Sequence, residues 1–573
     1  MDKTFRVAIV GGGPSALFLL QEVIQTASSQ LQLDIFEAGE QIGAGMPYSP
    51  AGANDEHVTN VSGNELPSLP MSLIDWMRTL SGDTLRTYCV DPDRLSEFKV
   101  VPRLLFGMYL RAQFDCLLAR AKERGFSVRC HLNTRVIDVV NAPHAASVTL
   151  HSQDRGEQQF DCVILCTGHV WIRSHEGQHP GYFDSPYPPT KLAGRFNHPI
   201  AIRGTSLTAI DAVRTLALSH GDFVRDDAGK LSFKRKKDCD DFRIVMHSRE
   251  GFLPGIRFHL EDPSLSKTRL LSEDELRAHM TANDGFISLD LLFELDFKNI
   301  FRDKEPEFYR LIAGMNLEQF VAAMMKYREE SDAFDYFKRE YAEASESIRS
   351  EQSVYWKEKL AVLSFAMNFP AKHFSAEDRL RLQNVLMPLI SIVIAFTPQS
   401  SCEQLIALYD GGALDLVAVG QNAEIKLHSD GGIIYHYSAD AANPASARFP
   451  LFVDCIGQIP LSFDKIPFAS LKNGAVSRAR LRFRSADEAV RQMEEGNSGV
   501  EQAEDGTYYL TVPGIAITDD FNVIGSDGAP NNRLYVMAVP LIAGYNPDYS
   551  GLDFCEAASK RIVTSIVRNL RNN

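Results

Sequence analysis

The feature that most constrains the fold is a glycine-rich turn at residues 7–16, VAIVGGGPSA. Four apolar residues run into Gly11, Gly13 and Ala16, and an apolar stretch with helical character follows. A strand, tight turn and helix in this order is typical of the first βαβ unit of a dinucleotide-binding domain. Gly11 allows the turn, and Gly13 lets the backbone approach a pyrophosphate. The acid Glu37 ends the next apolar run, where it can accept hydrogen bonds from ribose hydroxyls.

A second turn of the same kind occurs at residues 199–211, PIAIRGTSLTAID. It reads Gly204-x-Ser206-x-x-Ala209, so a small residue replaces the middle glycine. The strand predicted at 242–249 ends in Ser248 and Arg249, where an NAD site would have an acid. A hydroxyl and a guanidinium suit a 2′-phosphate, so this turn favours NADPH over NADH. A surface salt bridge of Arg249 is the alternative.

An internal repeat of one sequence pattern, which we call the internal echo, supports two nucleotide domains. Residues 160–168 and 449–457 are both apolar strands that end at a glycine, and each would close one nucleotide half. Between about 260 and 400 the strand patterns give way to charged amphipathic segments, which predict a helical insertion. It would either cover an active site or form a homo-oligomer contact. The predicted class is α/β, with two Rossmann-like domains and a helical insertion.

The predicted domains are interleaved along the chain. Residues 1–190 and 461–573 would form the first nucleotide domain, 191–260 and 406–460 the second, and 261–405 the insertion.

Bulk properties narrow the class of partner. The net charge of −15 makes a nucleic-acid partner unexpected. The longest apolar run, 385–396, is too short to span a bilayer and contains Pro388, so no membrane partner is expected. The first strand begins by about residue 6 and leaves no room for a signal peptide. The nine cysteines include no Cys-x-x-Cys pair, which suits reduced thiols in a cytoplasm. No metal site is predicted.

Further candidate residues lie between the two turns. In flavoproteins of this architecture the loop corresponding to 42–50 wraps the flavin. The small residues of this Gly/Pro-rich loop and Tyr48 favour close packing on something flat, and a simple surface loop is the alternative. The amide of Asn60 could meet a flavin ring or a substrate. Arg103 sits where a long helix begins, and a cation there opposes the helix dipole. Its anionic partner is therefore expected to be a cofactor phosphate, a substrate carboxylate, or an acidic side chain of the protein in a structural salt bridge. Backbone near Val136 would contact the adenine, and Gly168 would let the chain pass the pyrophosphate.

Five stretches together resemble the YdhS-like FAD/NAD(P)-binding proteins: residues 43–49, 101–103, 166–171, 204–211 and 248–254. The resemblance implies a flavoprotein that binds FAD at the first turn and NAD(P)H at the second. The predicted cofactor contacts are Gly11, Gly13, Pro14, Ser15, Glu37, Ala38, Met46, Pro47, Tyr48, Asn60, Arg103, Val136, Thr167, Gly168, Gly204, Thr205, Ser206, Leu207, Thr208 and Arg249.

More distantly, the layout is similar to flavin-dependent N-hydroxylating (class B) monooxygenases, such as aspartate N-monooxygenases. Those enzymes reduce FAD with NADPH and oxygenate an amine through a flavin hydroperoxide. Two departures stand out: Ala538 and Val539 replace the acid of the usual C-terminal flavin motif, and no catalytic base is identifiable.

The resemblance implies three readings of function. The first is an NADPH-dependent monooxygenase that uses molecular oxygen to N-hydroxylate a small amino acid or related amine. The second is an NAD(P)H-dependent flavin reductase or oxidase without oxygen insertion. The third is a non-catalytic flavin-binding protein whose helical insertion contacts a protein partner. The absence of a Cys-x-x-Cys pair disfavours disulfide-reductase chemistry.

Overall fold

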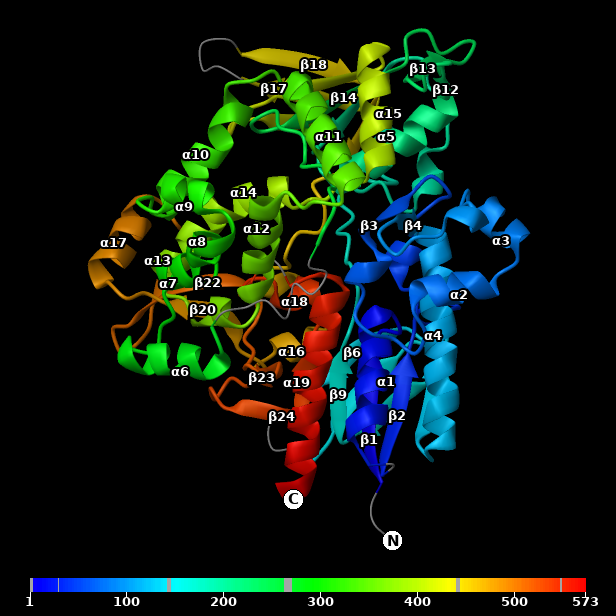
Figure 1. Cartoon of the computed structure of the whole chain (residues 1–573). Coiled ribbons are helices and arrows are strands. Elements are labelled where there is room, and N and C mark those ends of the chain that lie inside the picture. Colours follow the sequence, from blue (N-terminus) through cyan, green and yellow to red (C-terminus); the bar gives the residue numbers. More distant parts are fainter. Residues whose placement is uncertain are drawn as a thin grey trace.

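A six-stranded sheet organises the lower part of the molecule in Figure 1. The computed structural model describes residues 4–28, 30–141, 146–261, 271–438, 444–546 and 549–572. The sheet order is β23-β24-β9-β1-β2-β5, and every pairing is parallel except β23 with β24. The strands are β1 (Phe5–Val10), β2 (Leu31–Phe36), β5 (Ser127–His131), β9 (Cys162–Leu165), β23 (Asn522–Ile524) and β24 (Pro530–Val536).

Three long helices accompany this sheet: α1 (Pro14–Thr26), α4 (Arg103–Glu123) and α19 (Gly551–Asn572). Helices α1 and α19 lie side by side, so the last helix of the chain packs against the first (Figure 1). Cys162 and Cys166 are both buried in the core of this domain. The C-terminal segment thus completes the sheet that the first residues begin.

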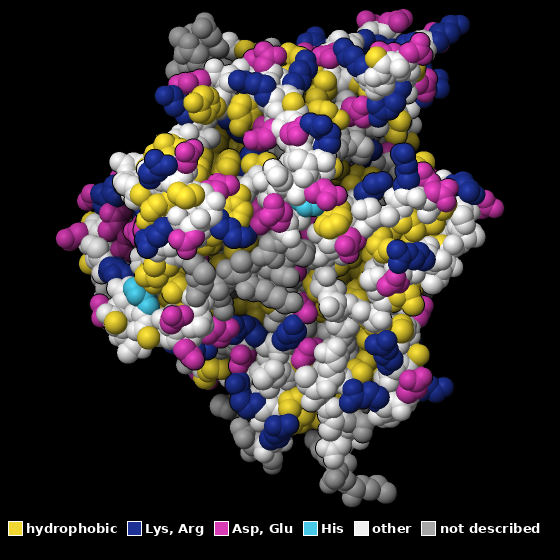
Figure 2. All heavy atoms as spheres, viewed as in Figure 1, with side chains coloured by type: hydrophobic (Ala, Val, Ile, Leu, Met, Phe, Trp, Pro, Cys, Tyr) yellow, Lys and Arg dark blue, Asp and Glu magenta, His cyan; other side chains and the backbone are white. Residues whose placement is uncertain are grey.

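A second, five-stranded sheet forms the upper part, in the order β10-β19-β11-β14-β15. All its pairings are parallel. Its strands are β10 (Tyr182–Phe183), β11 (Pro199–Arg203), β14 (Arg243–Ser248), β15 (Leu414–Ala418) and β19 (Leu451–Asp454), and α5 (Leu207–His220) follows the second glycine turn. The basic run at 234–237 lies at the end of the exposed hairpin β12 (Gly221–Arg225)–β13 (Leu231–Arg235). On the face shown in Figure 2, basic and acidic side chains are interspersed.

The internal echo is confirmed and extends further than predicted. Strands β9 and β19 each pair in parallel with the strand before a glycine turn. Each is preceded by a three-stranded antiparallel sheet. These sheets are β6 (Val136–Val140), β7 (Val148–Ser152) and β8 (Gly156–Phe160), and β16 (Glu424–Leu427), β17 (Ile433–Tyr437) and β18 (Ala445–Phe449). The predicted α/β class with two Rossmann-like domains is confirmed.

The region between β14 and β15 is helical, as predicted. Its helices are α6 (Glu273–Ala282), α7 (Leu289–Leu295), α8 (Phe301–Lys304), α9 (Pro306–Ile312), α10 (Leu317–Glu329), α11 (Ala333–Ser350), α12 (Tyr355–Ala366), α13 (Ala376–Arg381), α14 (Met387–Val393) and α15 (Gln399–Asp410). Phe334 of α11 and Leu405 of α15 join the core of the second nucleotide domain. The others surround a separate core that includes Phe293, Phe297 and Phe320. We call this second group, with the turn η6 (Pro370–His373), the helical domain.

The segment from 461 to 520 contains structure that the sequence did not indicate. Strands β20 (Arg478–Arg482), β21 (Val500–Gln502) and β22 (Tyr508–Ile515) form an antiparallel sheet, and α17 (Ala486–Glu494) lies against it. This sheet packs beside α13 of the helical domain (Figure 1). The remaining elements are β3 (Val58–Ser62), β4 (Val100–Pro102), α2 (Leu73–Thr79), α3 (Gly82–Thr87), α16 (Ala469–Lys472) and α18 (Val539–Ile542). Within the described residues, no helix has both the length and the apolar character needed to cross a membrane.

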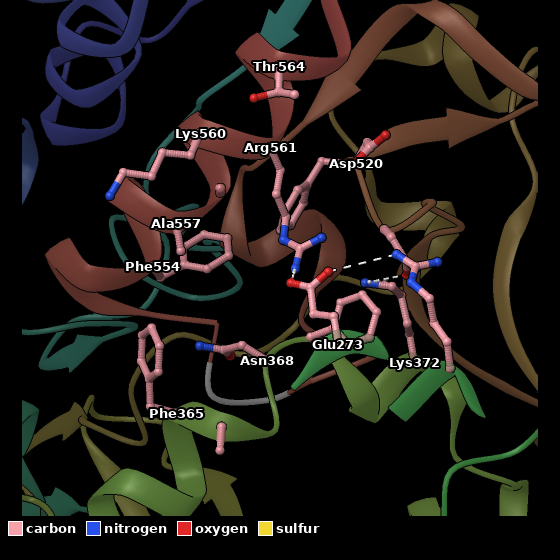
Figure 3. A pocket seen from close by; sticks show the side chains of 16 residues that line it. Glu273, Phe365, Asn368, Lys372, Asp520, Phe554, Ala557, Lys560, Arg561 and Thr564 are labelled. Atoms are coloured by element: carbon pink, nitrogen blue, oxygen red, sulfur yellow. Dashed lines mark hydrogen bonds and ion pairs between the residues drawn. The ribbon is translucent and has the colours of Figure 1, made fainter. Parts of the chain in front are cut away.

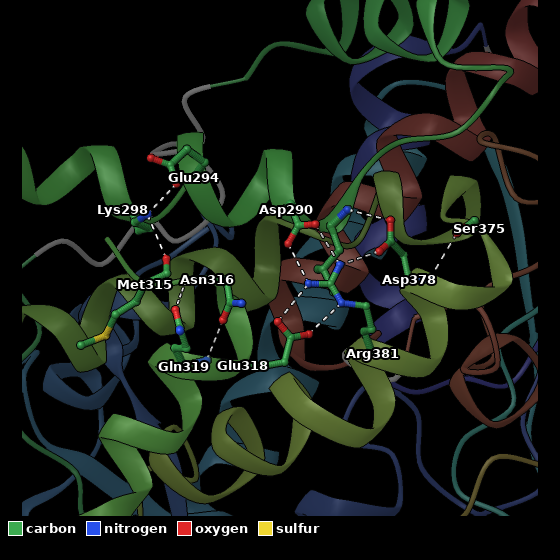
Figure 4. Close-up of polar contacts among 11 residues, drawn as sticks. Asp290, Glu294, Lys298, Met315, Asn316, Glu318, Gln319, Ser375, Asp378 and Arg381 are labelled. Carbon is green, nitrogen blue, oxygen red and sulfur yellow. Dashed lines mark hydrogen bonds and ion pairs between the residues drawn. The ribbon is translucent and has the colours of Figure 1, made fainter. Parts of the chain in front are cut away.

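One arginine ties together three helices of the helical domain (Figure 4). The guanidinium of Arg381 on α13 lies 2.7 Å from a carboxylate oxygen of Asp290 on α7 and 2.8 Å from one of Glu318 on α10. Its third carboxylate partner, Asp378, is 2.9 Å away on the same helix. The planar guanidinium can serve all three because it offers five N–H donors in a fixed arrangement.

We expect Arg381→Met to lower the free energy of unfolding by about 2 kcal/mol, because three charge-assisted contacts lose their donor at once. The control is Arg349→Met, whose side chain is 77% exposed and pairs with one carboxylate on its own helix. That change should cost about 0.5 kcal/mol or less. Urea denaturation followed by circular dichroism measures both values, and equal effects would contradict the bridging role.

Candidate active site between the two nucleotide domains

A cavity of about 500 Å³ lies where the two nucleotide domains and the helical domain meet. The first domain contributes the turn η1 (Met46–Tyr48) and β3, the second contributes the start of α5, and the start of α19 completes one side. Seven predicted cofactor contacts line it: Met46, Pro47, Tyr48, Asn60, Arg103, Leu207 and Thr208. The structure therefore brings residues from both predicted nucleotide sites to one space.

The first glycine turn is shaped by backbone sterics and one carboxylate. Gly11 has a φ of +108°, and a Cβ there would lie 2.4 Å from the carbonyl oxygen of Cys166. Only glycine fits such a position. The carboxylate of Glu37 accepts hydrogen bonds from the N–H of Gly12 at 2.8 Å and of Gly39 at 2.7 Å. Glu37 thus braces the turn itself.

The start of α1 fits a diphosphate. Gly13 is the N-cap residue, Pro14 is the first helical residue, and no side chain caps the helix. The free N–H groups and positive dipole end of an uncapped helix suit an anion. The hydroxyl of Ser15 lies 3.4 Å from the Sγ of Cys555 on α19. These residues fit FAD, with its pyrophosphate at this helix end.

The other predicted FAD contacts lie around the carboxyl edge of the first sheet, outside the cavity. Ala38 is exposed, directly after Glu37. The N–H of Thr134 donates to the carbonyl of Glu37 at 2.8 Å. This bond holds the segment before β6 at the same edge of the sheet, and Val136 lies two residues further on, at the start of β6. Thr167 and Gly168 follow β9, and a Cβ on Gly168 would meet nothing within 4 Å.

The second turn repeats the geometry of the first. Gly204 has a φ of +113°, and a Cβ there would lie 2.7 Å from the carbonyl oxygen of Cys455. Thr205 and Ser206 complete the turn, and Ser206 is the N-cap of α5 without a side-chain cap bond. These features fit a second dinucleotide. Arg249 follows β14, with a side chain that is 64% exposed. Its Nε lies 3.9 Å from the carboxylate of Glu250, a loose salt bridge that leaves N–H donors for a phosphate.

Arg103 has its anionic partner within the protein. Its guanidinium contacts both carboxylate oxygens of Asp211 on α5, at 2.5 and 3.2 Å, and its Nε donates to the carbonyl of Val58. Of the alternatives left open by the sequence, the structure thus shows the structural salt bridge. Contact between Arg103 and a cofactor stays a prediction.

The Arg103–Asp211 pair is buried and joins the two nucleotide domains. Tyr187 donates a hydrogen bond from its hydroxyl to Asp211 at 2.7 Å. The Nε2 of the buried His57 lies 3.2 Å from the carbonyl oxygen of Asp211. Burial acts to lower the pKa of Arg103, but the charge of Asp211 outweighs it and the pKa is raised overall. The charged form of Arg103 is therefore stabilised by its carboxylate partner.

Two further acidic residues, Glu65 and Asp553, line the cavity. Arg257 forms an ion pair with Glu65 and donates to the hydroxyl of Ser62 at 2.6 Å. Asp553, in the first turn of α19, has no hydrogen-bond partner among the described residues. Burial raises the pKa of Asp553 to about 7, and the charges of Glu65 and Glu556 add to the effect.

Sequence reasoning missed several lining residues, among them Asp211, Tyr187, Trp171, Glu65 and Asp553. A signal for Asp211 existed, because an acid stands among Ala209, Ile210, Ala212 and Val213 on a predicted buried helix, and Arg103 required an anion. For the others no local pattern differs from that of an ordinary surface residue.

Two glycine turns of matching geometry, each followed by a helix whose start no side chain caps, define a two-dinucleotide-binding-domain flavoprotein. Comparison with known families agrees: residues 8–170 match the FAD-NAD(P)-binding family, and residues 272–394 match the YdhS-like middle domain. The uncharacterized protein YdhS of Escherichia coli (strain K12) is 27% identical over 469 residues, which cover 82% of this chain and 86% of that protein. The resemblance to the YdhS-like FAD/NAD(P)-binding proteins is confirmed, and residues 8–170 are an FAD-NAD(P)-binding domain.

Solved structures with a similar course of the chain include two ornithine hydroxylases. The ornithine N-hydroxylase of Kutzneria sp. 744 has a TM-score of 0.45 at 12% identity, with 99% of this chain and 100% of that chain covered. The ornithine hydroxylase of Pseudomonas aeruginosa has a TM-score of 0.45 at 11% identity, with 99% of both chains covered. The bacillithiol disulfide reductase of Bacillus cereus has a TM-score of 0.41 at 11% identity, also with 99% of both covered.

We expect Asp211→Asn to lower the free energy of unfolding by about 3–5 kcal/mol, because it leaves the buried Arg103 cation without a counter-charge. The control is Asp83→Asn, whose carboxylate is 96% exposed and pairs with Arg86. It should cost about 0.5 kcal/mol or less. Urea denaturation measures both, and a cost of Asp211→Asn as small as that of the control would contradict the role of the pair.

Proposed function

We propose that the protein is a FAD-dependent, NADPH-using monooxygenase that hydroxylates the amine nitrogen of a small amino acid or related metabolite. The observation that carries the proposal is the shared cavity, in which side chains from both nucleotide domains meet a partnerless carboxyl, Asp553. The nicotinamide of NADPH, the flavin and a cationic amine could therefore all bind next to one another in this cavity.

The lining suits oxygen chemistry because one wall is apolar. Ala361, Phe365, Ile394 and Phe396 face the cavity from the helical domain and the segment that follows it. Such a wall keeps bulk water from the reacting groups, which suppresses loss of the oxidising equivalents as peroxide. When bound, FAD would take a hydride from NADPH and reduce O₂, of which one atom goes to the amine nitrogen and one to water.

The chain's own part is to bind and deprotonate the amine. An ammonium group has no lone pair, so it must lose a proton before its nitrogen can be oxygenated. The carboxylate of Asp553 would hold the ammonium by a charge-assisted hydrogen bond and accept that proton. Arg249 would bind the 2′-phosphate of NADPH at the carboxyl end of β14.

Cysteine chemistry finds no support at this site. All nine cysteines lie in the described residues and are free, and none lines the cavity. Cys555, two residues after Asp553, is buried, and burial raises the pKa of its thiol to about 11. A reactive thiolate is therefore not available there.

The deciding experiment mixes FAD-loaded protein with NADPH in air and follows flavin absorbance, peroxide and hydroxylamine product across a panel of amino acids and diamines. We expect reduction by NADPH, and a fall in peroxide matched by N-hydroxylated product when one amine is present. Reduction with stoichiometric peroxide regardless of amine would establish a reductase or oxidase instead. Failure of both NADPH and NADH to reduce the flavin would leave a non-catalytic flavin-binding protein.

Gly204→Ala provides an internal control for that experiment. Its Cβ would collide with the carbonyl of Cys455, so the second turn must distort while the first stays intact. FAD content should be unchanged and reduction by NADPH should slow strongly, whereas Gly314→Ala, with nothing within 4 Å of its Cβ, should behave as the unaltered protein.

We expect Asp553→Asn to stabilise the FAD-free protein at alkaline pH. The folded-state pKa of about 7 exceeds the ordinary value of 3.8, so folding favours the protonated acid. The resulting penalty is absent below about pH 4, grows as pH rises and is complete above about pH 7. The gain in melting temperature should follow the same course between about pH 4 and 8. The control is Asp487→Asn, on the exposed surface of α17, which should change the melting temperature little, as is usual for exposed surface substitutions.

A further inference from the structure

A second cavity, of about 510 Å³, lies between α19 and the helical domain (Figure 3). One wall is α19, from Phe554 to Thr564, and the other comes from α6, the end of α12 and the turn η6. Residues 519–521, before β23, form a third side. Phe365 lines both this cavity and the shared cavity described above. No residue of the two glycine turns lines this second cavity.

We propose that this second cavity is a binding site for a small organic anion, a carboxylate carried on an apolar body. The proposal goes beyond the redox reaction and does not rest on it. Four cations line the cavity, namely Arg277, Lys372, Lys560 and Arg561, together with three carboxylates, those of Glu273, Asp519 and Asp520.

Each of the three carboxylates is already engaged by a cation or an imidazole. Asp519 lies 3.1 Å from the ammonium of Lys372 and 2.8 Å from the Nε2 of His373. Glu273 pairs with Arg561 (Figure 3), and Asp520 lies 2.5 Å from the guanidinium of Arg568. A cationic ligand would therefore have to share a carboxylate with the cation or imidazole already beside it, and the like charges would repel each other.

An anionic ligand meets donors with capacity to spare. The side chain of Lys372 is 4% exposed, and its ammonium has three N–H groups but one carboxylate partner. Burial lowers the pKa of this ammonium, so a second negative charge beside it would stabilise the charged form. The Nδ2 of Asn368 is buried and has no acceptor among the described residues, while its Oδ1 accepts from Asn546 at 2.7 Å. Both groups belong to the helical-domain wall.

The remaining lining is aromatic. Phe365, Phe369, Phe521 and Phe554 all line the cavity, and the guanidinium of Arg561 lies 4.8 Å from the ring centre of Phe369. Apolar walls stabilise an apolar body by removing its surface from water, whereas an inorganic ion would gain nothing from them. The combination of spare donors with aromatic walls thus selects a carboxylate on an apolar body.

The test is calorimetric titration of the full-length, FAD-loaded protein with three probes: benzoate, benzylammonium and acetate. Benzylammonium keeps the ring and inverts the charge, and acetate keeps the carboxylate and removes the ring. We expect benzoate to bind about tenfold or more tightly than either of the others. Saturating NADP⁺ should not displace it, because the nucleotide site lies elsewhere.

Lys372→Met should weaken benzoate binding about tenfold or more, since it removes the buried ammonium and keeps an apolar stem of similar length. The matched control is Lys560→Met. Lys560 also lies at this cavity, but its side chain is 55% exposed, bonds to Glu556 and points away from Lys372 (Figure 3), so affinity should change by less than about twofold.

Benzoate that fails to bind at millimolar concentrations, binds no better than benzylammonium, or is displaced by NADP⁺ would overturn the proposal. So would equal loss of affinity in the two lysine variants. The FAD content and melting temperature of each variant show whether it folds. If Lys372→Met does not fold, the three probes on the unaltered protein still decide the matter.

Discussion

The buried ion pair between Arg103 and Asp211 sets the geometry on which the rest of the site depends. Arg103 starts the long helix α4 of the first nucleotide domain, and Asp211 lies in α5 of the second. Neither charge can be left alone in a buried place, so the two helices must meet at hydrogen-bond distance. Because α5 begins at the second glycine turn, this contact also fixes where the second turn lies relative to the first domain.

The two nucleotide domains use the same arrangement to let a turn pass close to a neighbouring strand. In each, a glycine with positive φ faces the carbonyl of the cysteine just after a neighbouring parallel strand, Cys166 for Gly11 and Cys455 for Gly204. The close approach aligns the next helix so that its uncapped end lies at the carboxyl edge of the sheet. The charged residue after the second strand of each domain differs: Glu37 braces the first turn, whereas Arg249 extends beside the second as an exposed cation.

Much of this fold could be predicted because its signals are local. The glycine turns, the parallel strands and the helical insertion each follow from patterns within about twenty residues. The antiparallel sheet of β20, β21 and β22 was missed because α17 separates β20 from the short β21, and because β22 contains Pro513 and Gly514, which are unfavourable within a strand. The partner of Arg103 was left open for a different reason. An ion pair that spans 108 residues leaves no trace in either segment beyond the need for an opposite charge.

The helical domain adds walls to both cavities that the two nucleotide domains alone would not provide. It has its own core, which includes Phe293, Phe297 and Phe320 and is separate from the cores of the two nucleotide domains. Phe365, near the end of α12, is a wall of both cavities. Because the protein interior is close-packed, a ligand that moves this ring from one side changes the space on the other. The shared cavity of the nucleotide domains and the charged cavity behind α19 are therefore separated, at this point, by a single aromatic ring.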